Sequence, residues 1–469
     1  MTTAPFSPRL ASSAGERLGQ KLDSIPFSPY HLAVILVLGL MGFVEGYDAA
    51  LTGSLIVLAK APLHMAAGEI RFLAISAGVT LVIGGFLGSA VSDHISRKAV
   101  IQIGVISTTF FTLLIPLAQS GVQLLVIRVL TGLGMGFGIY AAFPIAAELL
   151  PAQHRRTYGA IYEIMLAASF ALSPFAGLLV AHNPNGFRLI ALPGGLMLFV
   201  VPFLVHFVIP ESSRWQLRKG QVQAAVDTVN ELIKRCGNRV RPLTVAELGR
   251  DFEGAREQLP PYSALLARGQ LRWTTIGTLT QMLAVTGYYL IAVLLPKALI
   301  DQGAAVTMSF GISTLIFLTS IPGKAFIAYL MEAIGRRWTI FYALLGGLPG
   351  LVLMTLAHLA GAYAPLVMSL GAALTGFTAL SAFPATRVYL SEQFPTALRG
   401  RGHFFGESVG RIFAAVAVPF FLEPHTASPI IFFGTLIVIV LVGAFLPILF
   451  GKETVGQIEL FTEKGAELA

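Results

Sequence analysis

Charged residues are scarce in this sequence. Only 12% of its 469 residues are Asp, Glu, Lys or Arg, whereas 55% are hydrophobic. A soluble protein carries about 25% charged residues, so this chain has too few of them to cover a water-exposed surface. Long apolar runs stand in their place, without the alternation of apolar and polar residues that marks membrane strands. We therefore expect an all-α integral membrane protein.

Cysteines and metal-ligand patterns are also missing. The single cysteine, Cys236, excludes an internal disulfide and any cysteine-rich metal or iron–sulfur site. The nine histidines are scattered without an HExxH motif, and no nucleophile–base pair falls within an apolar run. We expect no bound metal, no cofactor and no enzymatic activity.

The net charge is +8, from 32 Lys and Arg against 24 Asp and Glu. In a soluble protein such an excess would suggest a nucleic-acid partner. Here the basic residues fall mainly between the apolar runs, so membrane topology explains them and we expect no nucleic acid.

Twelve apolar runs are long enough to cross a bilayer as helices. We place them near residues 31–58, 72–92, 98–118, 122–148, 156–182, 187–209, 272–298, 305–331, 337–358, 363–391, 402–424 and 428–450. They define an N-terminal tail (1–30), a first six-helix half (31–209), a central segment (210–271), a second six-helix half (272–450) and a C-terminal tail (451–469).

The central segment is the one substantial polar piece between the runs. Residues 221–235 have apolar positions at helical spacing, and Gly237-Asn238 is a suitable helix stop. A second short helix is expected at 244–258. We interpret the segment as a cytoplasmic linker rather than as a regulatory or partner-binding domain.

Basic residues occupy every second loop between the runs. They are Arg97-Lys98, Arg155-Arg156, Arg336-Arg337, and Arg399 with Arg401. The intervening loops near 119–121, 359–362 and 423–427 contain no Lys or Arg. The positive-inside rule then places both termini and the central segment in the cytoplasm, for a multi-pass protein of the inner or plasma membrane.

The two halves repeat each other in sequence. A shift of 244 residues places Glu148 on Glu392, Arg155 on Arg399 and Glu163 on Glu407. A shift of 239 residues places the pattern Asp93-x-x-Ser96-Arg97-Lys98 on Glu332-x-x-Gly335-Arg336-Arg337. Parallel repeats of six spans, related by an axis along the membrane normal, are the architecture of a major-facilitator transporter.

Three motifs carry a family resemblance. They are the loop from Asp93 to Lys98, the run Glu148-Leu149-Leu150-Pro151-x-x-x-Arg155 with its copy from Glu392 to Arg399, and Pro210-Glu211-Ser212-Ser213-Arg214-Trp215. They resemble the major facilitator superfamily, in particular its metabolite:H⁺ and aromatic acid:H⁺ symporters and the related sugar porters. The resemblance implies two six-helix pseudo-repeats, a helical cytoplasmic central loop and transport by alternating access.

The same resemblance implies a cytoplasmic gate of ion pairs between helix ends. Its candidate residues are Asp93, Arg97, Glu148, Arg155, Glu332, Arg336, Glu392 and Arg399. Such pairs are easily broken and remade near water, which suits a gate that opens in every cycle. Static charges that only set the topology are the alternative.

An ionisable residue inside a span costs at least about 2.5–3.5 kcal/mol on insertion, so each one indicates a functional or structural role. Asp48 in the first span and Arg128 in the fourth reach comparable depth, at about 1.5 Å of rise per residue. A carboxylate beside a fixed cation makes a proton switch. The two positions also resemble the proton-coupling positions of sugar and aromatic-acid symporters. We predict that Asp48 and Arg128 couple transport to protons, with Glu45 sharing the role; a structural ion pair is the alternative.

Glu407 and Arg411 lie at i and i+4 in the eleventh span. Gly410-Arg411 followed by Pro419 resembles a pattern of metabolite symporters in which the arginine is a candidate anion-binding residue. A planar guanidinium suits a carboxylate because it donates two parallel hydrogen bonds. A purely structural pair along one helix face is the alternative.

Glu163, the repeat partner of Glu407, lies where sugar porters tend to carry a sugar-binding glutamine, and it is a second solute-binding candidate. Lys324 and Arg387 lie near the inner ends of their spans, so we expect them to snorkel and assign them no role.

The seventh span contributes Gln281, Tyr288 and Tyr289 as further solute-binding candidates. It lacks the second glutamine and the asparagine that sugar porters usually carry here. Two tyrosines offer flat faces and hydroxyls to an aromatic or small carboxylate. Membership of an outer interfacial belt is the alternative. The glycine run at 132, 134, 136 and 138 indicates close helix packing, because no strand precedes it as a dinucleotide site requires.

Together these features predict a monomeric proton-coupled symporter that imports a small organic solute across the lipid bilayer. The expected solute is an organic or aromatic carboxylate, and the proton gradient supplies the energy without a cofactor. A sugar or polyol symporter, a proton-coupled drug exporter and, from another class, a non-transporting solute sensor are the alternatives.

Overall fold

A computed structural model describes residues 14–92, 94–151, 154–248, 260–422 and 428–454. These residues form helices and no strands. Eleven helical stretches among them are long and apolar enough to cross a membrane. One of these, Arg336–Glu392, has 57 residues and turns back at Gly361, whose backbone is left-handed at φ 53°. It therefore crosses twice, which confirms the twelve predicted spans.

The first half contains six crossings, built by nine helices. They are α2 (Pro29–Leu58), α3 (Ala67–Val91), α4 (Arg97–Leu114), α5 (Gly121–Ile139) with α6 (Ala142–Leu149), α7 (Arg155–Val180), and the broken crossing of α8 (Gly186–Leu189), α9 (Leu192–Leu196) and α10 (Val201–Val208). Prolines at positions 193 and 202 each fall at the start of a helix, where no backbone donor is needed, and they account for the breaks in the last crossing.

The second half repeats this plan. Its crossings are α14 (Arg268–Tyr289) continued by α15 (Leu295–Asp301), α16 (Val306–Ile334), α17 (Arg336–Leu356), α18 (Ala364–Phe377) with α19 (Phe383–Glu392), α20 (Thr396–Ala417) and α21 (Pro429–Phe450). A π-helical turn at Leu290–Leu294 joins α14 to α15. Most predicted boundaries agree within four residues, and the largest differences lie in the span predicted at 402–424, where α20 begins at Thr396 and ends at Ala417.

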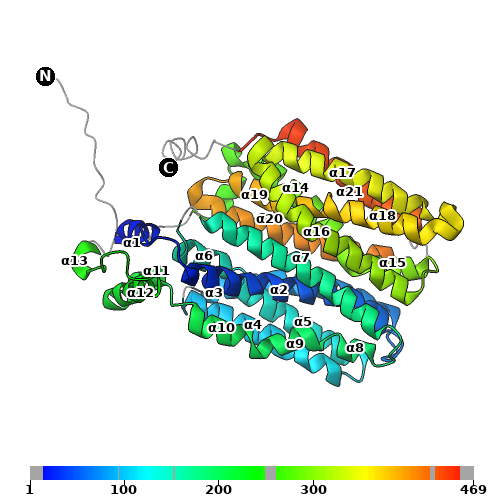
Figure 1. Cartoon of the computed structure of the whole chain (residues 1–469), viewed down its shortest axis with the longest axis horizontal. Helices are drawn as coiled ribbons and strands as arrows, with labels where there is room; N and C mark the ends of the chain where they lie inside the picture. The colour runs from blue at the N-terminus through cyan, green and yellow to red at the C-terminus, as the bar shows by residue number, and fades with distance from the viewer. Residues whose placement is uncertain (1–13, 93, 152–153, 249–259, 423–427, 455–469) are drawn as a thin grey trace.

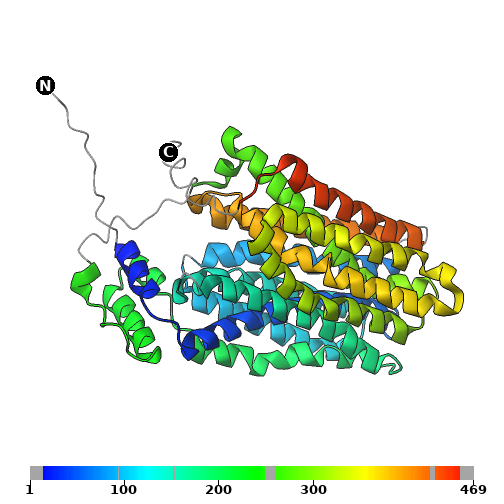
Figure 2. The same cartoon turned by 45° about the horizontal axis from the view of Figure 1, so that its top comes forward.

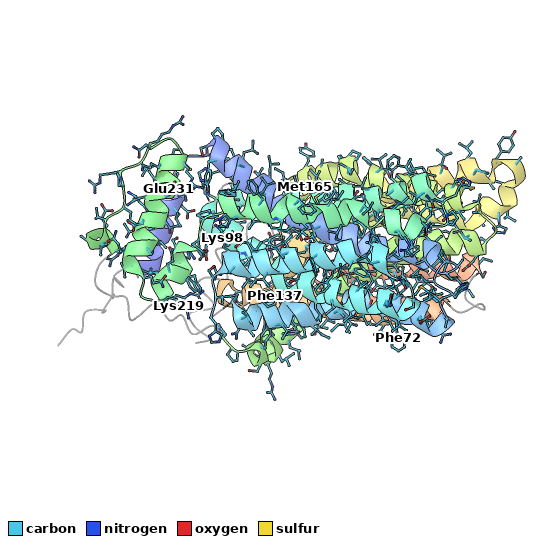
Figure 3. The ribbon with its side chains drawn as sticks, turned by 90° about the horizontal axis from the view of Figure 1, so that it is seen from below. Phe72, Lys98, Phe137, Met165, Lys219 and Glu231 are labelled. Carbon is cyan, nitrogen blue, oxygen red and sulfur yellow. The ribbon has the colours of Figure 1, made fainter. Side chains whose placement is uncertain are left out.

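The two halves lie side by side as two bundles with roughly parallel helices, as Figure 1 and Figure 2 show. Across the boundary α7 packs on α16, α3 packs on α20, and α2 packs on the π-helical turn. The surface around the bundles is apolar: Phe72, Leu179 and Phe203 are among the side chains more than 60% exposed. An apolar exterior of this kind faces lipid, and Figure 3 shows Phe72 on it.

The central segment and α1 (Ala14–Asp23) gather at one end of the bundles, which we call the segment end (Figure 1). The segment contains α11 (Ser213–Arg218), α12 (Val222–Arg235) and α13 (Val245–Leu248). The helix predicted at 221–235 is thus confirmed, and it stops at Gly237 and Asn238, both with positive φ. Of the helix predicted at 244–258, residues 245–248 are helical and 249–259 lie outside the described residues. Lys219 and Glu231 mark this polar end in Figure 3.

Cys236 closes α12 against the start of α2. Its thiol lies 3.6 Å from Nδ1 of His31, and the cysteine is 4% exposed. Burial raises the pKa of the Cys236 thiol above its ordinary value.

Glycines on α5 bring the helices of the first half into close contact, as the glycine run predicts. A Cβ on Gly136 would lie 1.8 Å from the carbonyl oxygen of Leu81 in α3. A Cβ on Gly138 would lie 2.9 Å from the Cα of Gly104 in α4. Only glycine permits this approach, so α3, α4 and α5 form one tightly packed unit.

We predict that Gly136→Ala destabilises the protein by about 1–3 kcal/mol, because the added methyl forces α3 and α5 apart. Gly311→Ala in α16 is the matched control, since a Cβ at that position meets nothing within 4 Å. Thermal unfolding of both variants in detergent measures the difference, and equal melting temperatures would contradict the packing argument.

Candidate functional site

The first buried ion pair joins Asp48 of α2 to Arg128 of α5. Arg128 is 1% exposed and Asp48 is 7% exposed. Nη1 of Arg128 donates to Oδ1 of Asp48, and its Nη2 donates to Oδ2 at 3.2 Å and to the Asp48 carbonyl oxygen at 3.0 Å. Nη2 also donates to Oγ1 of Thr52 at 2.8 Å. The structure therefore brings together the two residues that the depth argument pairs.

Glu45, which lies one helical turn before Asp48, does not contact this pair. Its carboxylate accepts hydrogen bonds from the hydroxyl of Tyr162 and from Nη2 of Arg411. Arg128 already has partners in Asp48 and Thr52, whereas Glu45 is held by Tyr162 of the first half and Arg411 of the second. A share of Glu45 in proton coupling therefore stays a prediction, and only Asp48 and Arg128 form the predicted pair.

A second set of buried charges crosses the boundary between the halves. We call it the interface network, and its members are Glu45, Glu163, Lys324, Arg387, Glu407 and Arg411. Three acids and three bases make it electrically balanced. Glu45 and Glu163 come from the first half, and the other four come from the second.

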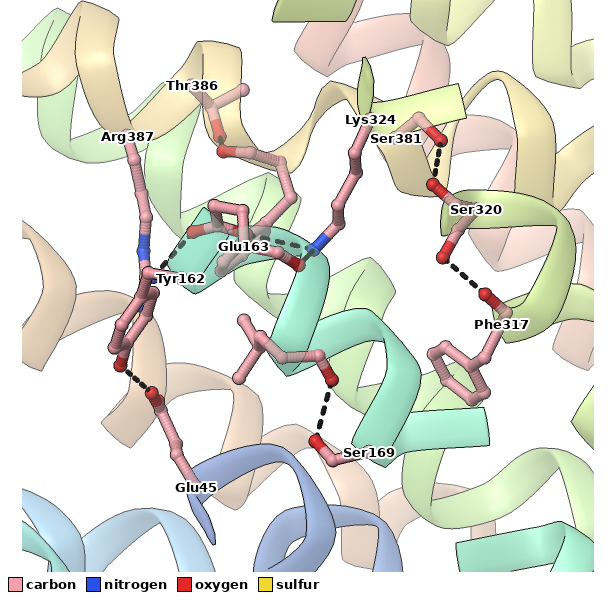
Figure 4. A network of polar contacts seen from close by, with 12 residues as sticks. Glu45, Tyr162, Glu163, Ser169, Phe317, Ser320, Lys324, Ser381, Thr386 and Arg387 are labelled. Atoms are coloured by element: carbon pink, nitrogen blue, oxygen red, sulfur yellow. Dashed lines mark hydrogen bonds and ion pairs between the residues drawn. The ribbon is translucent and has the colours of Figure 1, made fainter. Parts of the chain in front are cut away.

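The network is continuous from one residue to the next. Arg411 contacts Glu45 and lies 3.4 Å from the Glu407 carboxylate through Nε. Arg387 lies 2.8 Å from Glu407 and 2.7 Å from Glu163. Nζ of Lys324 lies 2.8 Å from Oε2 of Glu163 (Figure 4). Because each acid touches at least one base, no member carries an uncompensated charge.

The expectation that Lys324 and Arg387 snorkel to the membrane surface is wrong. Lys324 is 2% exposed and lies ten residues before the end of α16, about 15 Å from it. The side chain of Arg387 is 11% exposed and is held by two carboxylates. The insertion cost of an ionisable residue within a span is the sequence signal that points to both residues.

The candidates on the seventh span are buried beside the network. Nε2 of Gln281 donates to Oε1 of Glu407 at 2.6 Å. Tyr288 and Tyr289 are 5% and 4% exposed, so they are not members of an outer interfacial belt. Tyr288 instead packs against the rings of Phe170, Phe317 and Phe383.

The predicted gate residues form pairs at the segment end. In the first half Arg97 pairs with Glu148, which also accepts a hydrogen bond from Oγ of Ser212 at 2.5 Å. Arg155 pairs with Asp23 of α1 at 2.8 Å. Ser212 belongs to the motif after the sixth span, and the sequence alone did not reveal that it holds Glu148.

In the second half Arg336 contacts Glu392 at 3.2 Å and Glu332 at 3.5 Å. Oγ1 of Thr454 donates to Glu392 at 2.5 Å. Arg399 makes no ion pair with the residues that the structure describes, and Asp93 lies outside them. The pairs Arg97–Glu148 and Arg336–Glu392 thus join helix ends within one half, and Arg155–Asp23 joins the first half to α1. The interface network instead joins the halves.

Twelve crossings in two repeated halves, with buried ion pairs between them, define a transporter of the major facilitator superfamily. Residues 34–460 match the family model "Sugar (and other) transporter", so the chain belongs to this family.

Several known proteins are similar over most of their length. The niacin transporter NiaP of Acinetobacter baylyi is 23% identical over 94% of this chain and 98% of its own. A gallate transporter of Pseudomonas putida is 25% identical, covering 83% of this chain and 84% of its own. The xylose transporter XylE of E. coli, in a partially occluded inward-open conformation, has the same fold with a TM-score of 0.73 and 18% identity, over 92% of this chain and 99% of XylE.

We predict that Glu392→Gln lowers stability by about 1–3 kcal/mol, because it removes the charge that Arg336 faces in a buried pair. Glu332→Gln is the matched control, since the Glu332 side chain is 53% exposed against 13% for Glu392. Its expected effect stays within about 0.5 kcal/mol. Melting curves in detergent test the order, and a larger loss in Glu332→Gln would refute it.

Proposed function

We propose that this protein is a monomeric proton-coupled symporter that imports a small organic carboxylate, foremost an aromatic acid. It would work by alternating access in the cell membrane, with both termini and the segment end in the cytoplasm. The observation that carries the proposal is the buried pair of Asp48 and Arg128.

This pair links proton binding to helix packing. Ionised Asp48 is tolerated at membrane depth because Arg128 compensates its charge. Proton uptake by Asp48 would cancel its charge and weaken its hold on the guanidinium, so α2 and α5 would gain freedom to move relative to each other. Such a coupled change is the minimum that a proton-driven cycle requires.

The interface network supports alternating access and the choice of solute. The ion pairs Glu45–Arg411, Glu163–Lys324 and Glu163–Arg387 join the two halves, so the halves cannot separate at this depth without breaking them. An anionic solute would supply substitute partners for the bases. Arg411 and its fork of donors would then be one anion-binding group.

The relatives support the same choice. XylE is described as a proton:xylose symporter, and the two similar transporters are named for niacin and gallate. Niacin and gallic acid are both aromatic carboxylic acids. A sugar or polyol remains the second candidate, favoured by the family and by the fold shared with XylE.

We expect nicotinate or gallate, and not xylose, to raise the melting temperature of the purified protein. A carboxylate solute can take the place of a carboxylate side chain beside the bases of the interface network. A neutral sugar has no charge with which to replace it. A thermal-shift screen of the three compounds at equal concentration separates the candidates. Stabilisation by xylose alone would favour the sugar symporter.

We predict that Asp48→Asn abolishes uphill solute uptake driven by a pH gradient but leaves solute exchange measurable. Asparagine cannot carry the proton, although it still offers an oxygen to Arg128. Proteoliposomes loaded with the identified solute provide both assays, with Asp227→Asn on the exposed face of α12 as the control.

Normal pH-driven accumulation in Asp48→Asn would overturn the coupling assignment. Outward flux driven by the proton gradient would instead indicate an exporter, and binding without any flux would indicate a sensor.

A further inference from the structure

Glu163 holds two cations at once. Its Oε2 accepts from Nζ of Lys324 at 2.8 Å, and its Oε1 accepts from Nη1 of Arg387 at 2.7 Å. The three side chains come from α7, α16 and α19, so a carboxylate of the first half occupies a two-cation cradle of the second (Figure 4). We call Lys324 and Arg387 the clamp.

Aromatic rings form the walls of the clamp. Nζ of Lys324 lies 5.5 Å from the ring centroid of Tyr288 and 5.8 Å from that of Phe383. Cζ of Arg387 lies 4.8 Å from the Phe383 ring centroid. Cations at this distance from a ring face are held in position by the ring quadrupole, so the walls orient the clamp.

The rings continue away from the clamp as an aromatic cluster. Phe170 lies edge-on to Tyr288 at 4.8 Å and stacks on Phe317 at 5.1 Å, and Tyr288 lies 5.0 Å from Phe383. An apolar cavity lined in part by Ala284, Tyr288 and Phe383 borders this cluster. The rings therefore have space beside them in which to shift.

Two buried polar atoms near the clamp have no partner among the described residues. They are the hydroxyl of Tyr288, on a side chain 5% exposed, and Oε1 of Gln281, which is 0% exposed. Leaving such groups unsatisfied is costly, so they indicate that a polar ligand completes the site. The two cations of the clamp, its aromatic walls and the two hydrogen-bonding atoms without a partner together complement an aromatic acid.

We propose that Lys324 and Arg387 bind the carboxylate of an aromatic acid, and that Glu163 occupies this clamp when the solute is absent. Solute binding expels the Glu163 carboxylate, which then takes up one proton from the buffered solution and becomes a neutral carboxylic acid. The proposal rests on the proposed function and deepens it, because it names the solute class, its anchor and a second proton-carrying group besides Asp48.

Charge balance in the interface network requires the uptake of this proton when the solute binds. The interface network is neutral with three acids and three bases, so an incoming anion would leave one buried negative charge without a partner. One proton on one acid restores neutrality. Glu163 is that acid, because both its oxygens give up their cations to the solute, whereas Glu407 keeps Arg411 and Gln281.

Other groups around Glu163 belong to the same electrostatic environment. They are Glu45 on α2, Tyr162 on α7, Tyr288 on α14, Lys324 on α16, Arg387 on α19, and His403 and Glu407 on α20. Of these, Lys324 and Arg387 donate directly to the Glu163 carboxylate. A proton on Glu163 therefore requires that the clamp has found another carboxylate.

The test is calorimetric titration of the purified protein with nicotinate, benzoate and cyclohexanecarboxylate at neutral pH. Each titration is run in two buffers of different ionisation enthalpy, so that protons taken up are counted. The wild-type protein should bind both aromatic acids with uptake of about one proton per molecule. It should bind the saturated ring more weakly, because the ring lacks π-faces for the aromatic cluster.

Glu163→Gln should bind nicotinate at least as tightly as the wild type but without proton uptake, since no competing carboxylate has to leave. Lys324→Met should weaken binding by about 10- to 100-fold, the loss of a hydrogen bond to a charged group. The charge-balanced double variant Glu163→Gln/Lys324→Met should fold even where Lys324→Met does not, and it should bind about 10- to 100-fold more weakly than Glu163→Gln. Glu231→Gln on α12 is the matched control, with binding and proton uptake unchanged.

The outcomes separate this proposal from the function on which it rests. Proton uptake that persists in Glu163→Gln, or equal affinity in the double variant and in Glu163→Gln, would overturn the clamp while leaving a carboxylate symporter. Equal affinity for the saturated ring would overturn the aromatic specificity alone. Binding of xylose with none of the three acids would overturn both. Proton uptake retained in Asp48→Asn would support Glu163 as a separate proton carrier.

Discussion

Charge compensation at membrane depth is the constraint on which this structure depends. A hydrocarbon environment offers no water to a carboxylate or a guanidinium, so each buried ionic group must find its partner within the protein. Asp48 and Arg128 do so within the first half, whereas Glu45 and Glu163 find theirs across the boundary in the second. The first arrangement stabilises one bundle, and the second ties the two bundles together.

These two arrangements have different consequences for motion. A pair within one half keeps its geometry when the halves rock, so only a change of protonation or of local packing breaks it. A pair across the boundary is broken by the rocking itself, unless a solute or a proton replaces the lost partner. The gate pairs at the segment end, such as Arg336 with Glu392, belong to the first type in this structure. Solute and protons therefore act most directly on the interface network.

The sequence contained much of this architecture. Hydropathy and the internal repeat predicted twelve spans, because a helix that crosses lipid must be apolar over its full length. The rise of about 1.5 Å per residue along a regular helix places Asp48 and Arg128 at comparable depth, and this predicts their pairing. Cross-boundary partners could not be found in this way, since the rise along a helix gives depth but not which face meets the other half. For Lys324 and Arg387, closeness to a span end does not mean exposure. Lys324 is buried against Glu163 of α7, Tyr288 of α14 and Phe383 of α19.

The burial of Cys236 has a practical consequence. It is the only cysteine in the sequence, it lies buried at the C-terminal end of α12 against His31, and its raised pKa leaves little thiolate to react. Thiols engineered at the ends of the two bundles opposite the segment end would thus be the reactive thiols in the folded protein. Spin labels or fluorophores attached there would report the separation of the halves directly, in a background that keeps its native cysteine.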